Sequence, residues 1–95
     1  MTQRIGTHKT RIEQGSGETE VRYHGTAVVS FNDNEITLRT GGWKTATTKK
    51  RMNQTSDQFD LGFNVYQKSY QWFVVHRGQT VDFDGDSITL QRFAP

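Results

Sequence analysis

Apolar and polar residues alternate along much of the chain after residue 19, which is the pattern of half-buried β-strands. One such run extends from Glu20 to Phe31 and a second from Glu35 to Thr40. Asn-Asp-Asn at positions 32–34 separates them, and these residue types tolerate turn dihedrals. The two runs therefore predict a β-hairpin.

The second half of the chain repeats the alternation in shorter runs, which are separated by turn residues. The tight-turn dipeptide Asp84-Gly85 precedes the last run. Because every link is short, the pattern predicts an antiparallel meander. Its predicted strands are Leu61–Val65, Tyr70–Val74, Thr80–Phe83 and Ile88–Leu90.

The period changes over Thr47–Phe59, where Met52, Ser56 and Phe59 recur at i, i+4 and i+7. This spacing predicts a short helix with one weakly apolar stripe. Thr47 or Thr48 is the expected N-cap, because a hydroxyl there accepts a bond from a free backbone N–H. The predicted fold is α+β: a small, twisted antiparallel sheet of about six strands with one short helix, in the order β-β-α-β-β-β-β.

Residues 1–19 are polar, and Gly6, Gly15 and Gly17 interrupt them. We expect a mobile N-terminal arm at 1–19, or at most one strand that turns at Gln14–Gly17. Residues 20–95 form a single β-rich domain in this interpretation.

The 95-residue chain is 32% hydrophobic, below the roughly 45–50% of an average globular protein. Its thin core must rely on aromatic side chains, which make up 12% of the residues. Cysteine is absent, which favours a reducing compartment over a disulfide-bonded secreted scaffold. No apolar stretch approaches the ~20 residues of a membrane span, and the first 20 residues lack the apolar region of a signal peptide. We therefore expect a cytoplasmic protein with no membrane association.

The net charge of +2 is unevenly distributed along the chain. Residues 1–52 carry nine Lys or Arg and five Asp or Glu, whereas residues 53–95 carry three and five. This asymmetry is compatible with an anionic partner on one side of the molecule.

A basic, threonine-rich segment precedes and enters the predicted helix. It places Lys49, Lys50 and Arg51 in the first helical turn, where cations oppose the helix dipole. Such a cluster beside free N–H groups and hydroxyls is typical of a phosphate site, and Trp43 offers a stacking surface. The competing interpretation is a solvated helix face of good helix formers, with Trp43 covering the core. The candidate nucleic-acid or partner-binding residues are Trp43, Lys44, Thr45, Thr47, Thr48, Lys49, Lys50, Arg51 and Asn53, with Tyr66 or Tyr70 as additional aromatic contacts.

This segment reads G-G-W-K-T-A-T-T-K-K-R-M-N, follows a predicted hairpin, and is followed by V-Y-Q-K and W-F-V. It resembles small proteins of tailed bacteriophages that share the element GGWxTxTTxxRxN. The similarity extends from His24 to Val75, and its most specific positions are Thr45, Thr47, Thr48, Arg51 and Asn53. The resemblance implies a phage protein in the host cell cytoplasm and implies no mechanism.

Signals for catalysis or metal binding are weak. The acidic run Asp82–Asp86 departs from the spacing of an EF-hand loop, and a plain Asp-Gly hairpin turn explains it better. The three histidines, His8, His24 and His76, are far apart in the sequence. No cysteine nucleophile, G-x-S-x-G element or P-loop is present. We expect no cofactor, no metal and no enzymatic activity.

Three functions remain open at this point. The first is a non-enzymatic phage protein that binds nucleic acid through the basic helix start. The second is an inhibitor that binds a host protein, such as an antagonist of a defence system or an anti-CRISPR-type protein. The third is a structural or assembly protein that forms a homo-oligomer through an unpaired sheet edge.

Overall fold

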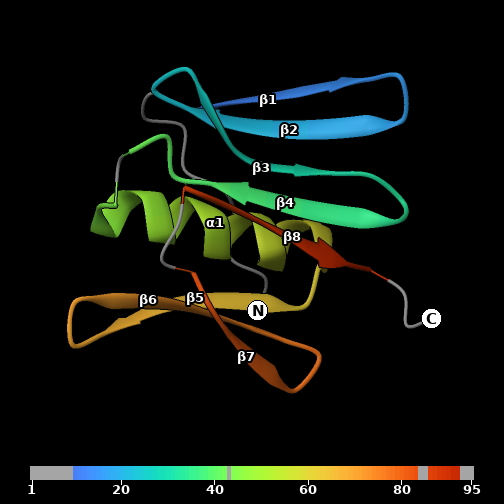
Figure 1. The fold of residues 1–95 in the computed structure, drawn as a ribbon. Helices are drawn as coiled ribbons and strands as arrows, with labels where there is room; N and C mark the ends of the chain where they lie inside the picture. Colours follow the sequence, from blue (N-terminus) through green and yellow to red (C-terminus); the bar gives the residue numbers. More distant parts are fainter. Residues whose placement is uncertain (1–9, 43, 84–85, 93–95) are drawn as a thin grey trace.

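Two antiparallel sheets and one helix form the described part of the computed structural model, which covers residues 10–42, 44–83 and 86–92 (Figure 1). One sheet has the strand order β1-β2-β3-β4-β8, and the other has the order β5-β6-β7. The α+β class with antiparallel strands is confirmed, whereas the predicted single sheet is wrong. The elements are β1 (Thr10–Gly15), β2 (Glu18–Tyr23), β3 (Thr26–Phe31), β4 (Glu35–Arg39), α1 (Ala46–Phe59), β5 (Phe63–Lys68), β6 (Gln71–His76), β7 (Gln79–Asp82) and β8 (Ser87–Gln91).

The run Glu20–Phe31, predicted as one strand, contains a hairpin. A two-residue turn at His24-Gly25 separates β2 from β3, and both turn residues have positive φ, at 53° and 81°. Glycine adopts this conformation readily, and histidine is among the residue types enriched there. By itself, a two-residue turn moves the inward side chains from odd to even positions. Val28 is an extra residue in β3 that restores the odd numbering, so that Val21 pairs with Val29. The alternation of the sequence therefore could not reveal the turn.

Part of the predicted N-terminal arm is a strand in the structure. Residues 10–15 form β1, which pairs with β2 through a turn at Ser16-Gly17. This agrees with the alternative of one strand turning at Gln14–Gly17, while residues 1–9 lie outside the described residues. β1 and the division of the first predicted strand raise the number of strands in the described ranges from the expected six to eight.

The last strand leaves the meander. β5, β6 and β7 pair consecutively as predicted, but β8 pairs with β4 in the other sheet. There Ile88 lies opposite Leu38 and Leu90 lies opposite Ile36. The expected hairpin between β7 and β8 is thus wrong, and its Asp84-Gly85 turn lies outside the described residues. The apolar face of β4 decides the pairing, because Leu90 is buried there and Ile88 packs half-buried against the core.

The core lies between the two sheets and around the middle of α1 (Figure 1). The register of β2 on β3 shifts between Val21 and Arg22, so that Val28 has no paired residue and is buried beside Val29. This bulge turns two consecutive valines into core residues. The five-stranded sheet supplies Val21, Val28, Val29, Ile36, Leu38 and Leu90, and the three-stranded sheet supplies Phe63, Val65, Trp72 and Val74, with Met52 from the helix.

α1 covers the whole predicted helical segment, Thr47–Phe59, and begins one residue earlier, at Ala46. Its N-cap is Thr45, whose hydroxyl accepts a bond from the Thr48 backbone N–H at 3.2 Å, so the expected cap at Thr47 or Thr48 is wrong. The predicted stripe is confirmed at Met52 and Ser56, which are buried. α1 is the one helix in the described ranges, and it is too short and too polar to span a membrane.

Candidate functional site

Asn53, one of the predicted binding residues, faces the inside of the molecule. Its side-chain amide donates to the Val65 carbonyl at 2.9 Å and accepts from the Val65 N–H at 2.7 Å. Nearby, the Ser56 hydroxyl accepts from the Phe63 N–H at 2.9 Å. These side chains form hydrogen bonds with backbone groups of β5 that point away from β6. The helix therefore closes one edge of the three-stranded sheet.

Arg51, which both interpretations of the segment place at the surface, is buried, with 6% of its surface accessible. Its Nε donates to the Thr10 hydroxyl at 2.9 Å, and its Nη1 donates to the Gln54 side chain at 3.0 Å. The guanidinium also lies 5.8 Å from the centre of the Tyr23 ring. The expectation of an exposed cation is wrong because position 51 adjoins the buried stripe, and β1 and β2 cover it. Arg51 ties the helix to the first hairpin.

The threonines of the segment have mostly local roles. Thr45 caps the helix, and its hydroxyl lies 3.1 Å from that of the fully buried Thr48. Thr47 is half-buried. Trp43 lies outside the described residues. Two hydroxyls expected to face a ligand are thus engaged with each other and with the helix start.

Three lysines of the segment face outward. Lys44 and Lys50 are exposed, and Lys49 is half-buried. The Lys49 ammonium donates to the Gln67 side chain of β5 at 3.0 Å and lies 5.4 Å from the centre of the Trp72 ring. Lys49 therefore connects the helix start to the hairpin formed by β5 and β6.

This hairpin extends the basic surface with a residue outside the predicted segment. Its tip carries Lys68, and Figure 1 shows the tip on the same side of the molecule as the start of α1. The sequence holds a signal for this arrangement, because residues 36–56 and 61–81 contain no Asp or Glu. The fold brings these two acid-free segments together. We call the surface of Lys44, Lys49, Lys50 and Lys68 the basic end.

An aromatic pair lies next to the basic end. Tyr66 on β5 and Phe73 on β6 are paired and half-buried, with ring centres 5.3 Å apart and ring planes inclined by 23°. Tyr66 shares a strand face with Lys68, since the two are separated by two positions. The face also has an acidic residue, Asp82, which lies opposite Phe73 on β7.

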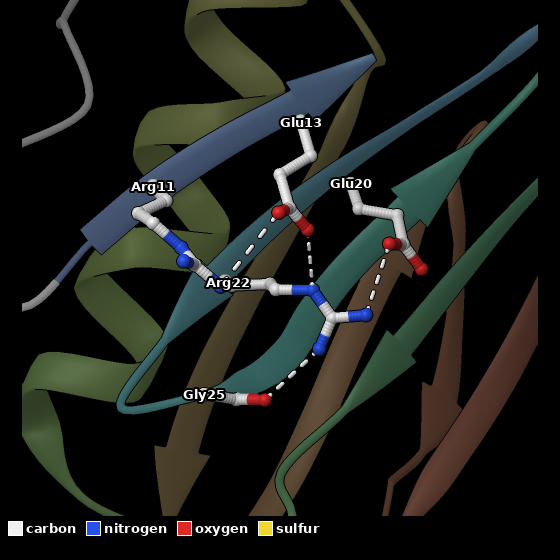
Figure 2. Close-up of polar contacts among 5 residues, drawn as sticks. All are labelled: Arg11, Glu13, Glu20, Arg22 and Gly25. Carbon is white, nitrogen blue, oxygen red and sulfur yellow. Dashed lines mark hydrogen bonds and ion pairs between the residues drawn. The ribbon is translucent and has the colours of Figure 1, made fainter. Parts of the chain in front are cut away.

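The first hairpin carries charges of both signs (Figure 2). Arg22 donates to Glu13 at 2.7 Å, to Glu20 at 3.1 Å and to the Gly25 carbonyl at 3.0 Å. The bonds to Glu13 and then to Glu20 raise the pKa of the Arg22 guanidinium. This arrangement fixes β1 on β2 through the outer face of the sheet.

A surface cavity of about 330 Å³ lies beside the turn of the same hairpin. Its lining includes three carboxylates, and no group of three His, Cys, Asp or Glu side chains suited to a metal ion occurs within the described ranges. The lining residues are Glu13, Gln14, Gly15, Ser16, Glu18 and Glu20. Cation binding therefore has no support here beyond the acidity of the cavity.

The histidines lie apart in the structure as well. His24 is in the turn between β2 and β3, not in a strand as expected, and His76 ends β6. Burial and then the neighbouring Arg77 lower the pKa of His76. His8 lies outside the described residues.

Comparison with known proteins places the chain among phage proteins. Residues 2–90 match the family described as Kyanoviridae Gp96 protein, and the chain belongs to this family. The phage context implied by the resemblance is thus confirmed, and the GGWxTxTTxxRxN element remains a prediction. No curated protein and no solved structure matches the chain.

Proposed function

We propose that this phage protein binds single-stranded nucleic acid at the basic end. The observation that carries the proposal is the convergence of two acid-free segments, one at the start of α1 and one in the β5–β6 hairpin. Four lysines from these segments provide contacts for phosphates, which dominate the affinity of most nucleic-acid-binding proteins.

The aromatic pair favours single strands over duplexes. Tyr66 and Phe73 are half-buried on the face of the three-stranded sheet opposite the core, where unpaired bases can stack on the rings. Lys68 follows Tyr66 on the same face and would contact the phosphate next to a stacked base. Asp82 sets the direction of the strand, because the phosphates avoid its carboxylate and run toward the hairpin tip.

Salt dependence tests the phosphate contacts. With four lysines engaged, raising the salt concentration fourfold should weaken binding of a short oligonucleotide by about 50-fold, as measured by fluorescence anisotropy. Changing Lys49, Lys50 and Lys68 together to Gln should lower the slope of log affinity against log salt by about two. Arg77→Gln, at the opposite end of β6, is the control and should leave the slope unchanged.

Tyr66→Ala tests the stacking contact separately. Loss of one stacked base should weaken binding by about 1–3 kcal/mol without changing the salt slope. The matched control is Asn64→Ala, two positions away on the same strand face. The proposal is wrong if the parent protein binds no single-stranded DNA or RNA at low salt, or if the triple variant binds as tightly as the parent.

Tyr70 supports a second candidate, a protein partner of the hairpin tip. Within the described ranges, turns at Ser16-Gly17, His24-Gly25, Ser69-Tyr70 and Arg77-Gly78 each have two residues with positive φ. In three of these turns the second residue is glycine, whereas in the β5–β6 turn it is Tyr70, with a φ of 67°. The Tyr70 side chain is 95% exposed. A bulky residue in this conformation is strained, and an exposed tyrosine is a frequent anchor of protein interfaces.

Tyr70→Gly distinguishes this candidate from nucleic-acid binding. Because glycine adopts a positive φ freely, the variant should be more stable by about 1 kcal/mol in thermal unfolding. If the tip binds a host protein, nuclease-treated host lysate should yield a partner with the parent protein and not with the variant. Equal capture by both proteins would contradict an anchoring role for Tyr70.

A further inference from the structure

β1 is an open edge of the five-stranded sheet in the described part of the chain. The sheet order ends at β1, and residues 11–15 of this strand are exposed. Ile12 is 43% exposed, one of few large apolar side chains with so much accessible surface. An edge strand with an exposed apolar residue can pair with a further strand.

The turn of the first hairpin determines which backbone groups are available. Gly15 and Glu18 close the two-residue turn, so they form a hydrogen-bonded pair, and such pairs alternate with non-hydrogen-bonded ones along the ladder. Ile12, opposite Val21, is therefore in a non-hydrogen-bonded pair. Its N–H and C=O point away from β2, and no described residue hydrogen-bonds to them.

The side chains of β1 select how a second copy would pair with it. A symmetric antiparallel pair centred on Ile12 joins outward-pointing backbone groups and places Arg11 of each copy opposite Glu13 of the other. Centring the pair on Arg11 would oppose two arginines, and centring it on Glu13 would oppose two glutamates. Like charges directly opposite each other destabilise a strand pair, and opposite charges stabilise it.

We infer that β1 is a self-complementary edge through which two copies of this chain pair, with Ile12 against Ile12 and Arg11 against Glu13. The exposed Ile12 side chains meet on one face of the joined sheet, and the ion pairs lie on the other. There they extend the existing contacts of Glu13, which accepts from Arg22 at 2.7 Å and lies 3.6 Å from Arg11. The contact is small, so the dimer is weak and depends on protein concentration.

Single cysteines test the register directly, because the chain contains no cysteine. Ile12→Cys should form a disulfide-linked dimer under mild oxidation, since its two copies face each other at a distance that a disulfide spans. Arg11→Cys, Glu13→Cys and Gln14→Cys are matched controls and should remain monomeric. In this register, each of these cysteines lies at least two positions along the strand from the same cysteine of the second copy. Faster linkage of Arg11→Cys or Glu13→Cys than of Ile12→Cys would overturn the register.

Ile12→Pro tests the edge without cross-linking. Proline removes an N–H that points to the second copy and leaves the hydrogen bonds between β1 and β2 in place. In sedimentation experiments up to millimolar concentration, the parent should become dimeric, and the variant should stay monomeric with an unchanged melting temperature. A parent protein that is monomeric throughout, or a variant that dimerises equally, would refute the inference.

Discussion

Val65 on β5 and Ile12 on β1 occupy equivalent places on two sheet edges. Each lies three residues before the pair that closes a two-residue turn, so each directs its N–H and C=O away from the neighbouring strand. At Val65 these groups bond to the Asn53 side chain of α1. At Ile12, no described residue hydrogen-bonds to the N–H or the C=O. One edge is closed by the helix, and the other is open.

The two edges also show that residues close together in the sequence have different roles. Asn53 and Arg51 belong to the threonine-rich element, yet Asn53 closes β5 and Arg51 holds β1 against the helix. The lysines that precede them in the segment face outward. A single sequence element thus stabilises the fold with one set of side chains and presents charge with another.

Replacing Asn53 should have the largest effect. Asn53→Leu leaves the N–H and C=O of Val65 without partners and should lower the free energy of unfolding by about 2–4 kcal/mol. Asn64→Leu, on the neighbouring exposed position, should change it by less than about 0.5 kcal/mol. Urea unfolding measures both. Equal effects would show that the β5 edge is not closed by the Asn53 amide.

Arg51→Met tests the contact between the helix and the open-edge strand. It removes bonds to Thr10 and Gln54 and should destabilise the protein by about 1–3 kcal/mol. The control is Lys50→Met, which changes an exposed neighbour and should remain within about 0.5 kcal/mol of the parent. Faster amide exchange throughout β1 in the Arg51 variant would accompany the loss. Unchanged stability would mean that Arg51 is available for binding after all.

Ser56→Ala should have a smaller effect on the closed edge. It leaves one group, the Phe63 N–H, without its acceptor, which lowers stability by about 1–2 kcal/mol. Hydrogen exchange should accelerate at Phe63 and much less at Val65, whose N–H is held by Asn53. Equal acceleration at both amides would indicate that the edge opens as one unit.

The smallest expected effect concerns pH and His76, which pairs with Phe63 on the closed side. Its pKa is lowered in the folded protein, so the unfolded chain binds more protons and stability falls on acidification. The contribution is complete above the unfolded pKa of about 6.5 and is lost as the pH falls through the lower folded value. The melting temperature of His76→Gln should therefore decrease less between about pH 7 and about pH 5 than that of the parent. Parallel curves would contradict this role.

Local patterns in the sequence determined much of the fold. The helical period of Met52 and Ser56 predicted α1 because buried positions recur on one face of any helix. Alternation predicted β5, β6 and β7, and the β3–β4 hairpin, where Asn32 accepts the backbone N–H groups of the turn. The family match supports the phage context that the threonine-rich element suggested. Lys44, Lys49 and Lys50 of the candidate site were also predicted from the sequence, whereas Lys68 was not.

Tertiary structure alone decided the rest. Alternation cannot detect the turn at His24-Gly25, since the bulge at Val28 restores the odd/even phase that a two-residue turn inverts. It also cannot specify that β8 pairs with β4, because strand pairing depends on apolar faces distant in sequence. Burial of Arg51 likewise follows from β1 and β2 lying over the helix. The sequence determined which residues could form strands, a helix and a charged surface. The packing of these elements determined which edge is closed, which is open and which cations reach solvent.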